Sequence, residues 1–331
     1  MKLVDGRLVN EGAVVSCSQG RVVAEAISKE LGIPHIPGEL KEYSLDELKP
    51  RPSESVSRYD VVFLVQTFPN RTNDRLMEMY LMSTALHRAH SLLIYGVVPS
   101  YPYARQDTIA APREPVSAKA VARLLELGGM YSLITVMLHA RQEVGFFSGP
   151  CDNLSMRGEI EGFVRQHFYQ PELLWVGPDE GSGRETKKIA GDLGIAHLVL
   201  PKTKDSAGNI HRPDTPVDVA GRPYAIGDDM VDGAGTVRTT VEFLNRRGGK
   251  DSKRYLVATH PILSGDAISI INDCGFSQIV FFDSIPIPPE KMDRFNVRPH
   301  ILSVNRVLSL AVGCRLRREP LPDLHKFECT I

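Results

Sequence analysis

The sequence predicts an α/β protein with two domains, each a mainly parallel β-sheet flanked by helices. Short apolar runs alternate with amphipathic stretches along most of the chain. Uninterrupted apolar strands separated by helices are typical of parallel sheets covered on both faces. The chain has 331 residues, of which 42% are hydrophobic. This is the length of roughly two domains, with enough apolar residues for packed cores.

The predicted strands and helices alternate in order along the chain. A helix over residues 21–31 ends at Gly32, a typical stop signal. In the helix over residues 236–247, Val237, Val241 and Leu244 share one face. Strands are expected over residues 13–16, 60–66, 92–98, 132–138, 173–177, 197–200, 224–227, 254–259 and 278–282, and the remaining helices over residues 73–90 and 117–127.

The domain boundary is expected near Pro150, where the segment FFSGPCDNLS has the composition of a loop. This divides the chain into a first domain over residues 1–149 and a second over residues 150–331. The last segment of the second domain is expected to pack back on the first.

Composition excludes several functional classes. Lys and Arg number 39 and Asp and Glu number 40, so the net charge is −1, which argues against a broad nucleic-acid-binding surface. The five cysteines lie far apart and form no CxxC pair, which argues against a disulfide framework or a structural zinc site. The chain has no apolar run of about 18 residues and no apolar signal-peptide core near its start. A cytoplasmic protein with neither nucleic acid nor membrane as partner is therefore expected.

The most informative local motif is YAIGDDMVDGAGT, over residues 224–236. An apolar strand ends in two acids, which can hold sugar hydroxyls or a hydrated magnesium ion. Glycine and alanine then let the backbone approach a ligand, and the free N–H groups at the helix start favour a phosphate. The alternative is an acidic turn with a helix cap. The acids are Asp228, Asp229 and Asp232, and the turn is formed by Gly233, Ala234, Gly235 and Thr236.

This motif resembles the phosphoribosyl-diphosphate (PRPP) binding motif of the phosphoribosyltransferase fold. By itself it leaves two classes open: transferases that consume PRPP and synthetases that make it. Further segments resemble the synthetases, the ribose-phosphate diphosphokinases, in order from about residue 13 to residue 312. They are VVFLVQTFPNRTNDRLMEM with Gln66, Pro69, Asn73 and Asp74, then VVPSYPYARQD, REPVSAKAVARLL, LHARQEVGFF, VGPDEGSGRETKKIA, ATHPILSGDA and DSIPI.

The resemblance implies two similar phosphoribosyltransferase-like domains and a diphosphoryl transfer from ATP to the 1-hydroxyl of ribose 5-phosphate. Such chemistry asks the protein mainly for alignment and charge neutralisation. It also implies that the motif over residues 224–236 binds ribose 5-phosphate. The ribose 5-phosphate residues are then Asp228, Asp229, Asp232, Gly233, Ala234, Gly235 and Thr236, with Gly233 standing where the family usually has threonine.

The resemblance assigns the ATP site to two segments. Arg105, Gln106 and Asp107 are expected to contact ATP, with the arginine near the phosphates and the glutamine near the base. A surface turn after a strand is the alternative for Arg105 and Gln106. Tyr43 and Glu47, in EYSLDEL, match part of a loop that reads adenine from a neighbouring subunit. An ordinary helix start is the alternative for EYSLDEL. A homo-oligomer built from dimers, often a hexamer, is therefore expected.

The metal and catalytic residues also follow from the resemblance. His139 and Asp179 match ligands of Mg²⁺, and His139 also belongs to the ATP site; a structural or surface histidine is the alternative for His139. Lys202 matches the catalytic lysine, and Lys204 replaces an arginine, which keeps the charge but loses the guanidinium fork. The alternative for both is a solvated loop lysine. The family has aspartate on both sides of His139, whereas here the two positions are Met137 and Arg141.

Three hypotheses follow. The first is an active, magnesium-dependent PRPP synthetase. The second is a catalytically weak or inactive homologue with a regulatory or assembly role. It is favoured by the altered positions Leu45, Met137, Arg141 and Gly233 and by the loop Lys202-Thr203-Lys204. The third is a PRPP-consuming transferase, against which the two-domain length and the Arg105 segment argue.

Overall fold

The chain divides into two compact units in the computed structural model. The first unit runs to Ser155 and resumes at Val304, and the second spans Met156–Ser303. The structure describes residues 2–4, 7–9, 11–89, 91–201, 203–204, 210–211, 219 and 221–322, with only the backbone for 2–4, 7–9, 203–204 and 210–211. Each unit is described by itself.

The first unit contains a seven-stranded sheet. Its strands are parallel except for the edge strand β5, which pairs antiparallel with β4. The inner strands β3, β6 and β8 are buried at every position, which is why the sequence shows them as continuous apolar runs. The order across the sheet is β5 (Leu48–Pro52), β4 (His35–Glu42), β3 (Gly12–Ser16), β6 (Val61–Val65), β7 (Leu93–Val98), β8 (Ser132–Val136) and β9 (Cys151–Leu154).

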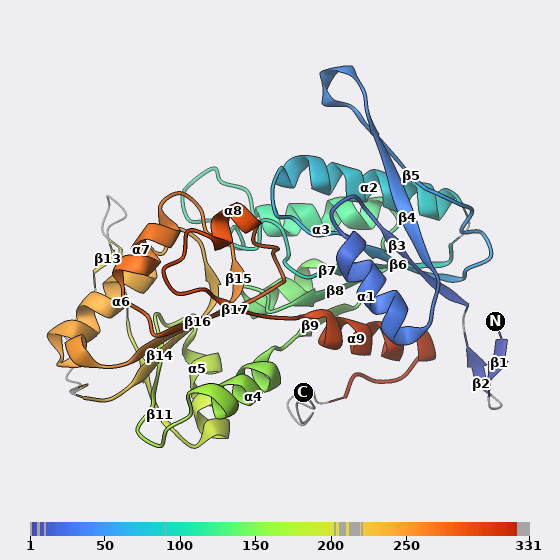
Figure 1. Cartoon of the computed structure of the whole chain (residues 1–331). Coiled ribbons are helices and arrows are strands. Elements are labelled where there is room, and N and C mark those ends of the chain that lie inside the picture. Colours follow the sequence, from blue (N-terminus) through green and yellow to red (C-terminus); the bar gives the residue numbers. More distant parts are fainter. Residues whose placement is uncertain are drawn as a thin grey trace. The chain divides into compact units, whose positions relative to one another are not determined.

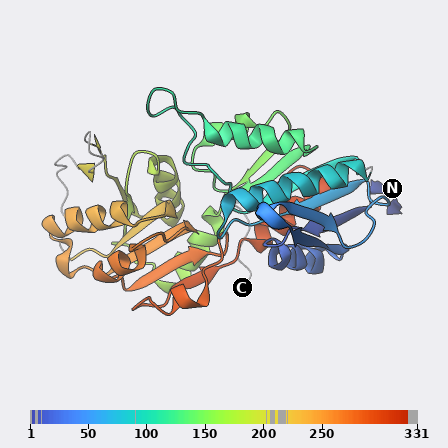
Figure 2. The same ribbon diagram turned by 90° about the horizontal axis from the view of Figure 1, so that it is seen from above.

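Helices cover both faces of this sheet (Figures 1 and 2). Helices α1 (Arg21–Leu31) and α9 (Asn305–Arg317) contact each other on one face. Helices α2 (Thr72–Arg88) and α3 (Ser117–Leu127) contact each other on the other face, where their apolar residues pack into the main core of the unit. The helix α9 comes from the end of the chain, so residues far apart in the sequence complete this unit.

The second unit contains a six-stranded, fully parallel sheet. Helices α4 (Arg157–His167) and α5 (Gly183–Leu193) contact each other, as do α6 (Gly235–Arg246) and α7 (Ala267–Asp273). The short helix α8 (Pro289–Met292) follows β16 (Gln278–Phe282). The order across the sheet is β11 (Ala196–Val199), β10 (Leu174–Gly177), β14 (Tyr224–Val231), β15 (Arg254–Pro261), β16 (Gln278–Phe282) and β17 (His300–Leu302).

Two small antiparallel pairs complete the described strands. They are β1 (Lys2–Val4) with β2 (Arg7–Val9), and β12 (Thr203–Lys204) with β13 (Ile210–His211). Three 3-10 turns also occur, η1 (Ser44–Asp46), η2 (Arg141–Phe146) and η3 (Gly249–Asp251).

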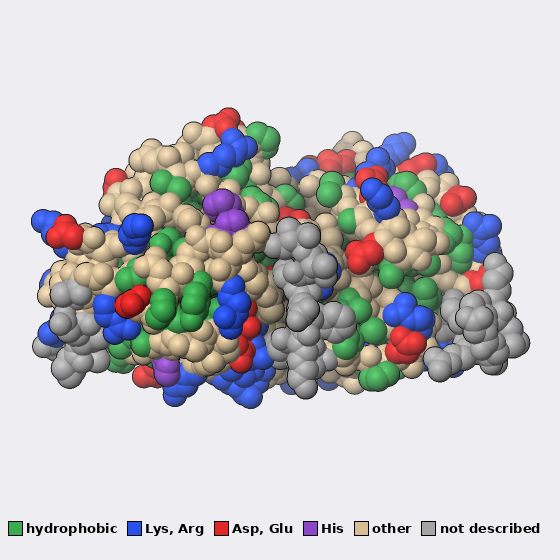
Figure 3. Space-filling model, turned by 60° about the horizontal axis from the view of Figure 1, so that its bottom comes forward, with side chains coloured by type: hydrophobic (Ala, Val, Ile, Leu, Met, Phe, Trp, Pro, Cys, Tyr) green, Lys and Arg blue, Asp and Glu red, His purple; other side chains and the backbone are tan. Residues whose placement is uncertain are grey.

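Within the described ranges, no helix is both long and apolar enough to cross a membrane. Figure 3 shows basic and acidic side chains interspersed over the visible face, in keeping with the balanced charge.

The predicted fold class is confirmed, and a strand is present at each of the nine predicted places. One predicted boundary was wrong in a way that matters for the site. The strand expected over residues 224–227 continues to Val231, because its parallel pairing with β15 extends to Pro261. The sequence also missed the β4–β5 hairpin, whose polar residues do not form an apolar run.

An ion pair fastens α9 to the first unit. The guanidinium of Arg315 donates from Nε to Oδ2 of Asp152 at 2.6 Å and from a second nitrogen to Oδ1. Asp152 lies in β9 and is buried, and its carboxylate raises the pKa of Arg315. Bidentate pairs of this kind are the strong class of salt bridge. The pair therefore joins the last helix to the edge strand β9.

Replacing Arg315 should destabilise the first unit. In Arg315→Met the buried Asp152 carboxylate loses its partner, which should cost about 2–3 kcal/mol and lower the melting temperature by roughly 5–10 °C. Thermal unfolding followed by circular dichroism measures this shift. Arg317→Met is the matched control, because Arg317 pairs with Glu319 on the surface and should change the melting temperature by about 2 °C or less. Equal shifts in the two variants would show that the Asp152 pair does not fasten α9.

Candidate active site

The carboxyl ends of β10 and β14 form the candidate ribose 5-phosphate site. The chain leaves β10 toward α5 and then forms β11 on one side of it, whereas β14 pairs on the other side. The order of strands therefore reverses between β10 and β14. Ligands of open α/β sheets bind at such a switch point, beyond the carboxyl ends of the strands.

The ribose 5-phosphate motif follows this edge. Asp228 and Asp229 lie inside β14 rather than beyond its end, because the strand continues to Val231. Ala234 then adopts the left-handed conformation, with φ 57°, and helix α6 begins at Gly235. Asp232 and Gly233 form the bend between them. Thr236 lies in the first turn of α6, and the N-terminus of a helix favours an anion.

Three carboxylates share one electrostatic environment at this edge. The backbone N–H of Asp229 donates to Oδ1 of Asp228 at 3.0 Å. Burial, and then the charges of Asp229 and Asp179, raise the pKa of Asp228 well above its ordinary value. The rise has two causes with the same sign: the charged form is desolvated and it is repelled by like charges. The site therefore favours binding of a cation or of hydroxyl groups that donate hydrogen bonds.

Asp179 is fixed by its own turn. Its Oδ1 accepts the N–H of Ser182 at 3.0 Å, and the Ser182 hydroxyl donates to the Asp179 carbonyl at 2.7 Å. The turn joins β10 to α5, so it places Asp179 beside β14. Asp179, Asp228 and Asp229, predicted from separate segments, are thus brought into one neighbourhood.

The donor set at this edge fits Mg²⁺. The described part of the chain contains no group of three or more His, Cys, Asp or Glu side chains arranged to hold a metal ion. Mg²⁺ usually keeps several waters and is held by one or two carboxylates together with substrate phosphates, so it does not need such a group. The carboxylates of Asp179, Asp228 and Asp229 have the chemistry that this binding mode requires.

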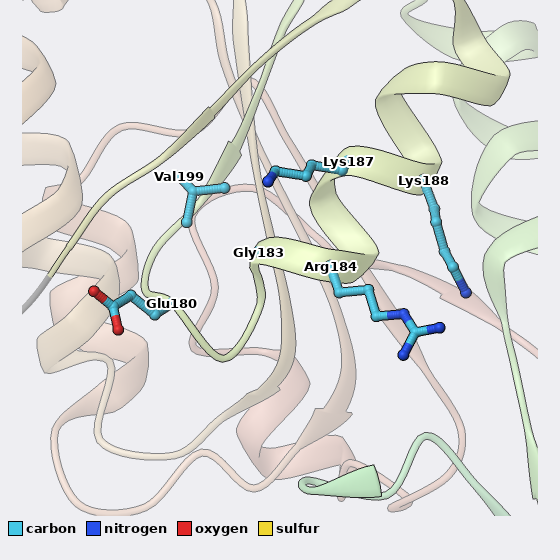
Figure 4. A pocket seen from close by; sticks show the side chains of 6 residues that line it. All are labelled: Glu180, Gly183, Arg184, Lys187, Lys188 and Val199. Carbon is cyan, nitrogen blue, oxygen red and sulfur yellow. The ribbon is translucent and has the colours of Figure 1, made fainter.

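A cavity of about 590 Å³ opens next to the Asp179 turn. Figure 4 shows Lys187 pointing toward Val199 of β11, whereas Arg184 and Lys188 point away from it. Glu180 and Gly183 complete the lining. Sequence reasoning missed these cations. The spacing of these basic residues along α5, in GRETKK, was the sequence signal that could have identified them.

The candidate nucleotide segments meet in the first unit, at the carboxyl ends of β7 and β8. Arg105 and Gln106 are exposed on the loop that follows β7, and His139 is exposed on the loop that follows β8. Gln142 donates from Nε2 to Oδ2 of Asp107 at 2.9 Å, which ties the two loops together. The structure therefore brings the Arg105–Gln106–Asp107 segment next to the stretch that contains His139.

Tyr43 and Glu47 lie elsewhere in the first unit, at the tip of the β4–β5 hairpin. The tip is a single 3-10 turn in which the Tyr43 N–H donates to the Glu47 carbonyl at 2.8 Å. The alternative of an ordinary helix start is therefore wrong. Figure 1 shows the hairpin projecting away from the sheet, apart from the loop that follows β7. Leu45 and Asp46 both have positive φ, at 63° and 59°.

The segment with Gln66 has a structural explanation. Gln66 is fully buried and donates to Oε2 of Glu78 at 3.0 Å. Glu78 also accepts the N–H of Ser18 at 2.6 Å and its hydroxyl at 2.7 Å, and Arg75 donates to the same hydroxyl at 3.0 Å. Buried polar groups that satisfy one another in this way fix a single local structure. Sequence reasoning missed Ser18 and Glu78, because their partners are distant along the chain.

The predicted catalytic lysines cannot be placed. Lys202 lies outside the described residues, and of Lys204 only the backbone, in β12, is described.

Comparison with known proteins identifies the family. Residues 13–129 match the N-terminal domain of ribose phosphate pyrophosphokinase, and residues 202–319 match the phosphoribosyl synthetase-associated domain. Ribose-phosphate pyrophosphokinase 1 of Lactococcus lactis is 34% identical over 93% of this chain and 94% of its own. The chain belongs to the ribose-phosphate pyrophosphokinase family.

Further members of the family are also similar to this chain. The enzyme of Mycobacterium tuberculosis is 35% identical over 81% of this chain and 82% of its own. The crystal structure of phosphoribosylpyrophosphate synthetase from Mycobacterium smegmatis is 29% identical, covers 93% of this chain and 99% of its own, and has a TM-score of 0.84. The assignment to an enzyme family of this kind is confirmed, and the PRPP-consuming alternative is not supported.

The two residue ranges matched by the family contain some of the candidate site segments and leave others out. The Arg105–Gln106–Asp107 segment lies in the first matched range, and the motif over residues 224–236 lies in the second. His139 and Asp179 lie between the two ranges. The roles expected for His139 and Asp179 are therefore argued from the local geometry described above.

Removing one of the clustered charges should stabilise the protein. The folded-state pKa of Asp228 is raised, so wild-type stability is highest when Asp228 is protonated and falls as the pH rises above the ordinary aspartate pKa of about 3.9. Asp228→Asn keeps Oδ1 as an acceptor and removes the charge. It should raise the unfolding free energy at pH 8 by about 0.5–2 kcal/mol and change it little at pH 4.

Melting temperatures at the two pH values test this prediction in the absence of ligand. Asp273→Asn is the control, because Asp273 is exposed at the end of α7 and should give no pH-dependent gain. A variant Asp228→Asn that melts below wild type at pH 8 would contradict the proposed repulsion.

Proposed function

We propose that this protein is an active ribose-phosphate diphosphokinase, which transfers the diphosphoryl group of ATP to the 1-hydroxyl of ribose 5-phosphate and gives PRPP and AMP. The observation that carries the proposal is the site at the switch point of the second unit. There Asp228 and Asp229 on β14 lead through a left-handed turn into α6, in a chain similar over 93% of its length to a ribose-phosphate pyrophosphokinase.

The second unit would bind ribose 5-phosphate. The 5-phosphate would accept hydrogen bonds from backbone N–H groups of the turn and from the Thr236 hydroxyl, at the positive end of the α6 dipole. The Asp228 and Asp229 carboxylates would accept hydrogen bonds from the ribose hydroxyls. Gly233, where the family has threonine, supplies a backbone donor without a hydroxyl.

The first unit would bind ATP. Arg105 would contact the phosphates as a planar cation. Gln106 would contact the base through its amide NH₂, because its Oε1 already accepts the Ser117 hydroxyl at 2.6 Å. Tyr43 and Glu47, exposed at the hairpin tip, would reach the adenine of a neighbouring subunit in a homo-oligomer built from dimers.

Mg²⁺ would supply charge neutralisation to the phosphates when bound. We assign Asp179, with Asp228 and Asp229 beside it, to Mg²⁺ binding in the second unit, and His139 to Mg²⁺ binding in the first unit. The chain itself would align the ribose 1-hydroxyl with the β-phosphorus and exclude other orientations, since phosphoryl-transfer catalysis is mainly positioning and electrostatic stabilisation. Lys202 and Lys204 would stabilise negative charge on the transferred group. The proposed setting is the cytoplasm.

The direct test is product formation by the purified chain. With ATP, ribose 5-phosphate and Mg²⁺, the protein should release AMP and PRPP in equal amounts, and a chelator should abolish the reaction.

Thr236→Val removes one donor to a charged phosphate and should raise KM for ribose 5-phosphate about tenfold while leaving KM for ATP unchanged.

Thr84→Val is the matched control, since the Thr84 hydroxyl donates to the Tyr80 carbonyl within α2 and lies outside the proposed sites. It should leave both KM values unchanged. Absence of product above the level of Lys202→Ala would reject the proposal.

A second candidate is a weak homologue that acts in an assembly with other synthetases. Two observations favour it. Met137 stands where the family has aspartate and has a φ of 44°, a conformation that aspartate tolerates better. Arg141 also stands where the family has aspartate, directly before the Gln142 that contacts Asp107.

Arg141 separates the two candidates. In the active enzyme we expect Arg141 to face the nucleotide phosphates, so Arg141→Asp should lower kcat/KM for ATP about tenfold or more. Lys29→Asp, an equal charge reversal on an exposed position of α1, should have little effect. If Met137→Asp combined with Arg141→Asp instead raises turnover tenfold, the chain as it stands is the weak homologue.

A further inference from the structure

We propose that Tyr103 is a positioning residue for the nucleotide site, and that its hydroxyl, donated to Asn73, holds the turn that presents Arg105 and Gln106. The inference rests on the proposed binding of ATP by this turn. Neither Tyr103 nor Asn73 is expected to contact the nucleotide.

The backbone of Tyr103 has an unfavourable conformation. Tyr103 has a φ of 60°, in the left-handed region that a bulky residue adopts only at an energetic cost. This conformation reverses the chain, and the N–H of Gln106 closes the turn by donating to the Tyr103 carbonyl at 2.9 Å. Strained residues that persist in a fold are held by their surroundings and cluster at functional sites.

The side chain of Tyr103 shows what holds the strained conformation. Its ring is half-buried and packs against the core of the first unit. Its hydroxyl donates to the Oδ1 of Asn73. The ring and the hydroxyl together fix both the tilt of the side chain and the direction in which the backbone leaves Tyr103.

Asn73 is a firm anchor for this bond. It lies in the first turn of α2, and the same helix carries Arg75 and Glu78, which are buried. These two residues bond to Ser18 and Gln66 in the network described above. The beginning of α2 is therefore tied to the ends of β3 and β6, and the hydroxyl of Tyr103 connects the loop after β7 to this fixed structure.

The other end of the turn is tied down separately. The Gln106 carbonyl accepts the N–H of Ala118 at 3.1 Å, and Asp107 accepts the Gln142 amide at 2.9 Å. The exit of the turn is thus held by α3 and η2, and the Tyr103 hydroxyl ties its entry to α2. Loss of the hydroxyl should let the entry move, so that Arg105 samples directions that do not suit the phosphates.

The experiment compares Tyr103→Phe with wild type in the full chain. Tyr103→Phe removes only the hydroxyl, and it should weaken binding of a non-hydrolysable ATP analogue, measured by calorimetry, about five- to tenfold. KM for ATP should rise by the same factor, and KM for ribose 5-phosphate should not change. The Gln106 amide should exchange its hydrogen about five- to tenfold faster. Tyr131→Phe, on a half-exposed tyrosine before β8, is the matched control and should match wild type.

Variants of Asn73 test the bond itself. Asn73→Asp keeps an acceptor and should stay close to wild type, whereas Asn73→Leu should reproduce the effect of Tyr103→Phe. The double variant Tyr103→Phe, Asn73→Leu should be no worse than either single variant, because both remove the same interaction.

Three results would overturn the inference: unchanged affinity for the ATP analogue in Tyr103→Phe, equal increases in both KM values, or additive losses in the double variant. A wild-type chain that binds no ATP would refute the proposed function. Exchange at the Gln106 amide would then still show whether the hydroxyl holds the turn, and an unchanged rate would refute that too.

Discussion

The parallel pairing of β10 with β14 is the constraint from which the candidate site follows. It brings Asp179, from the turn after β10, next to Asp228 and Asp229 in β14. Desolvation and repulsion make this arrangement costly for the folded protein, and the raised pKa of Asp228 is the sign of that cost. Strain of this kind is common where a site must hold a cation or a polar ligand, since stability is then given up for function.

The two units share a local strand order, but the polar residues at the matching edges of their sheets behave differently. In the first unit β3 lies between β4 and β6, as β10 lies between β11 and β14 in the second. At the edge beside β3 and β6, Ser18 and Gln66 both donate to the carboxylate of Glu78, so these polar groups satisfy one another. At the matching edge of the second unit the acids instead repel one another. In the first unit the polar groups at this edge are therefore bonded within the protein, and the exposed candidate residues of that unit lie beyond β7 and β8.

The loops of the first unit show how a parallel sheet brings distant residues together at one edge. The loops after β6, β7 and β8 meet because these strands are neighbours. Two side-chain bonds, from Tyr103 to Asn73 and from Gln142 to Asp107, then connect segments that are about 30 residues or more apart. Such bonds specify the positions of Arg105 and Gln106 more closely than the loop sequence can.

The sequence by itself determined the apolar strands, the acid–glycine–helix motif of residues 224–236 and the family, because each depends on a local pattern of residues. Polar edge strands such as β4 and β5 left no such pattern, and the continuation of β14 to Val231 depended on its pairing with β15. Only the tertiary structure decided that Glu78 bonds to Ser18, that Asp179 lies near Asp228, and that Arg315 of the last helix pairs with Asp152. Each of these contacts joins residues far apart along the chain, and strand order and register, which no local pattern encodes, bring them together.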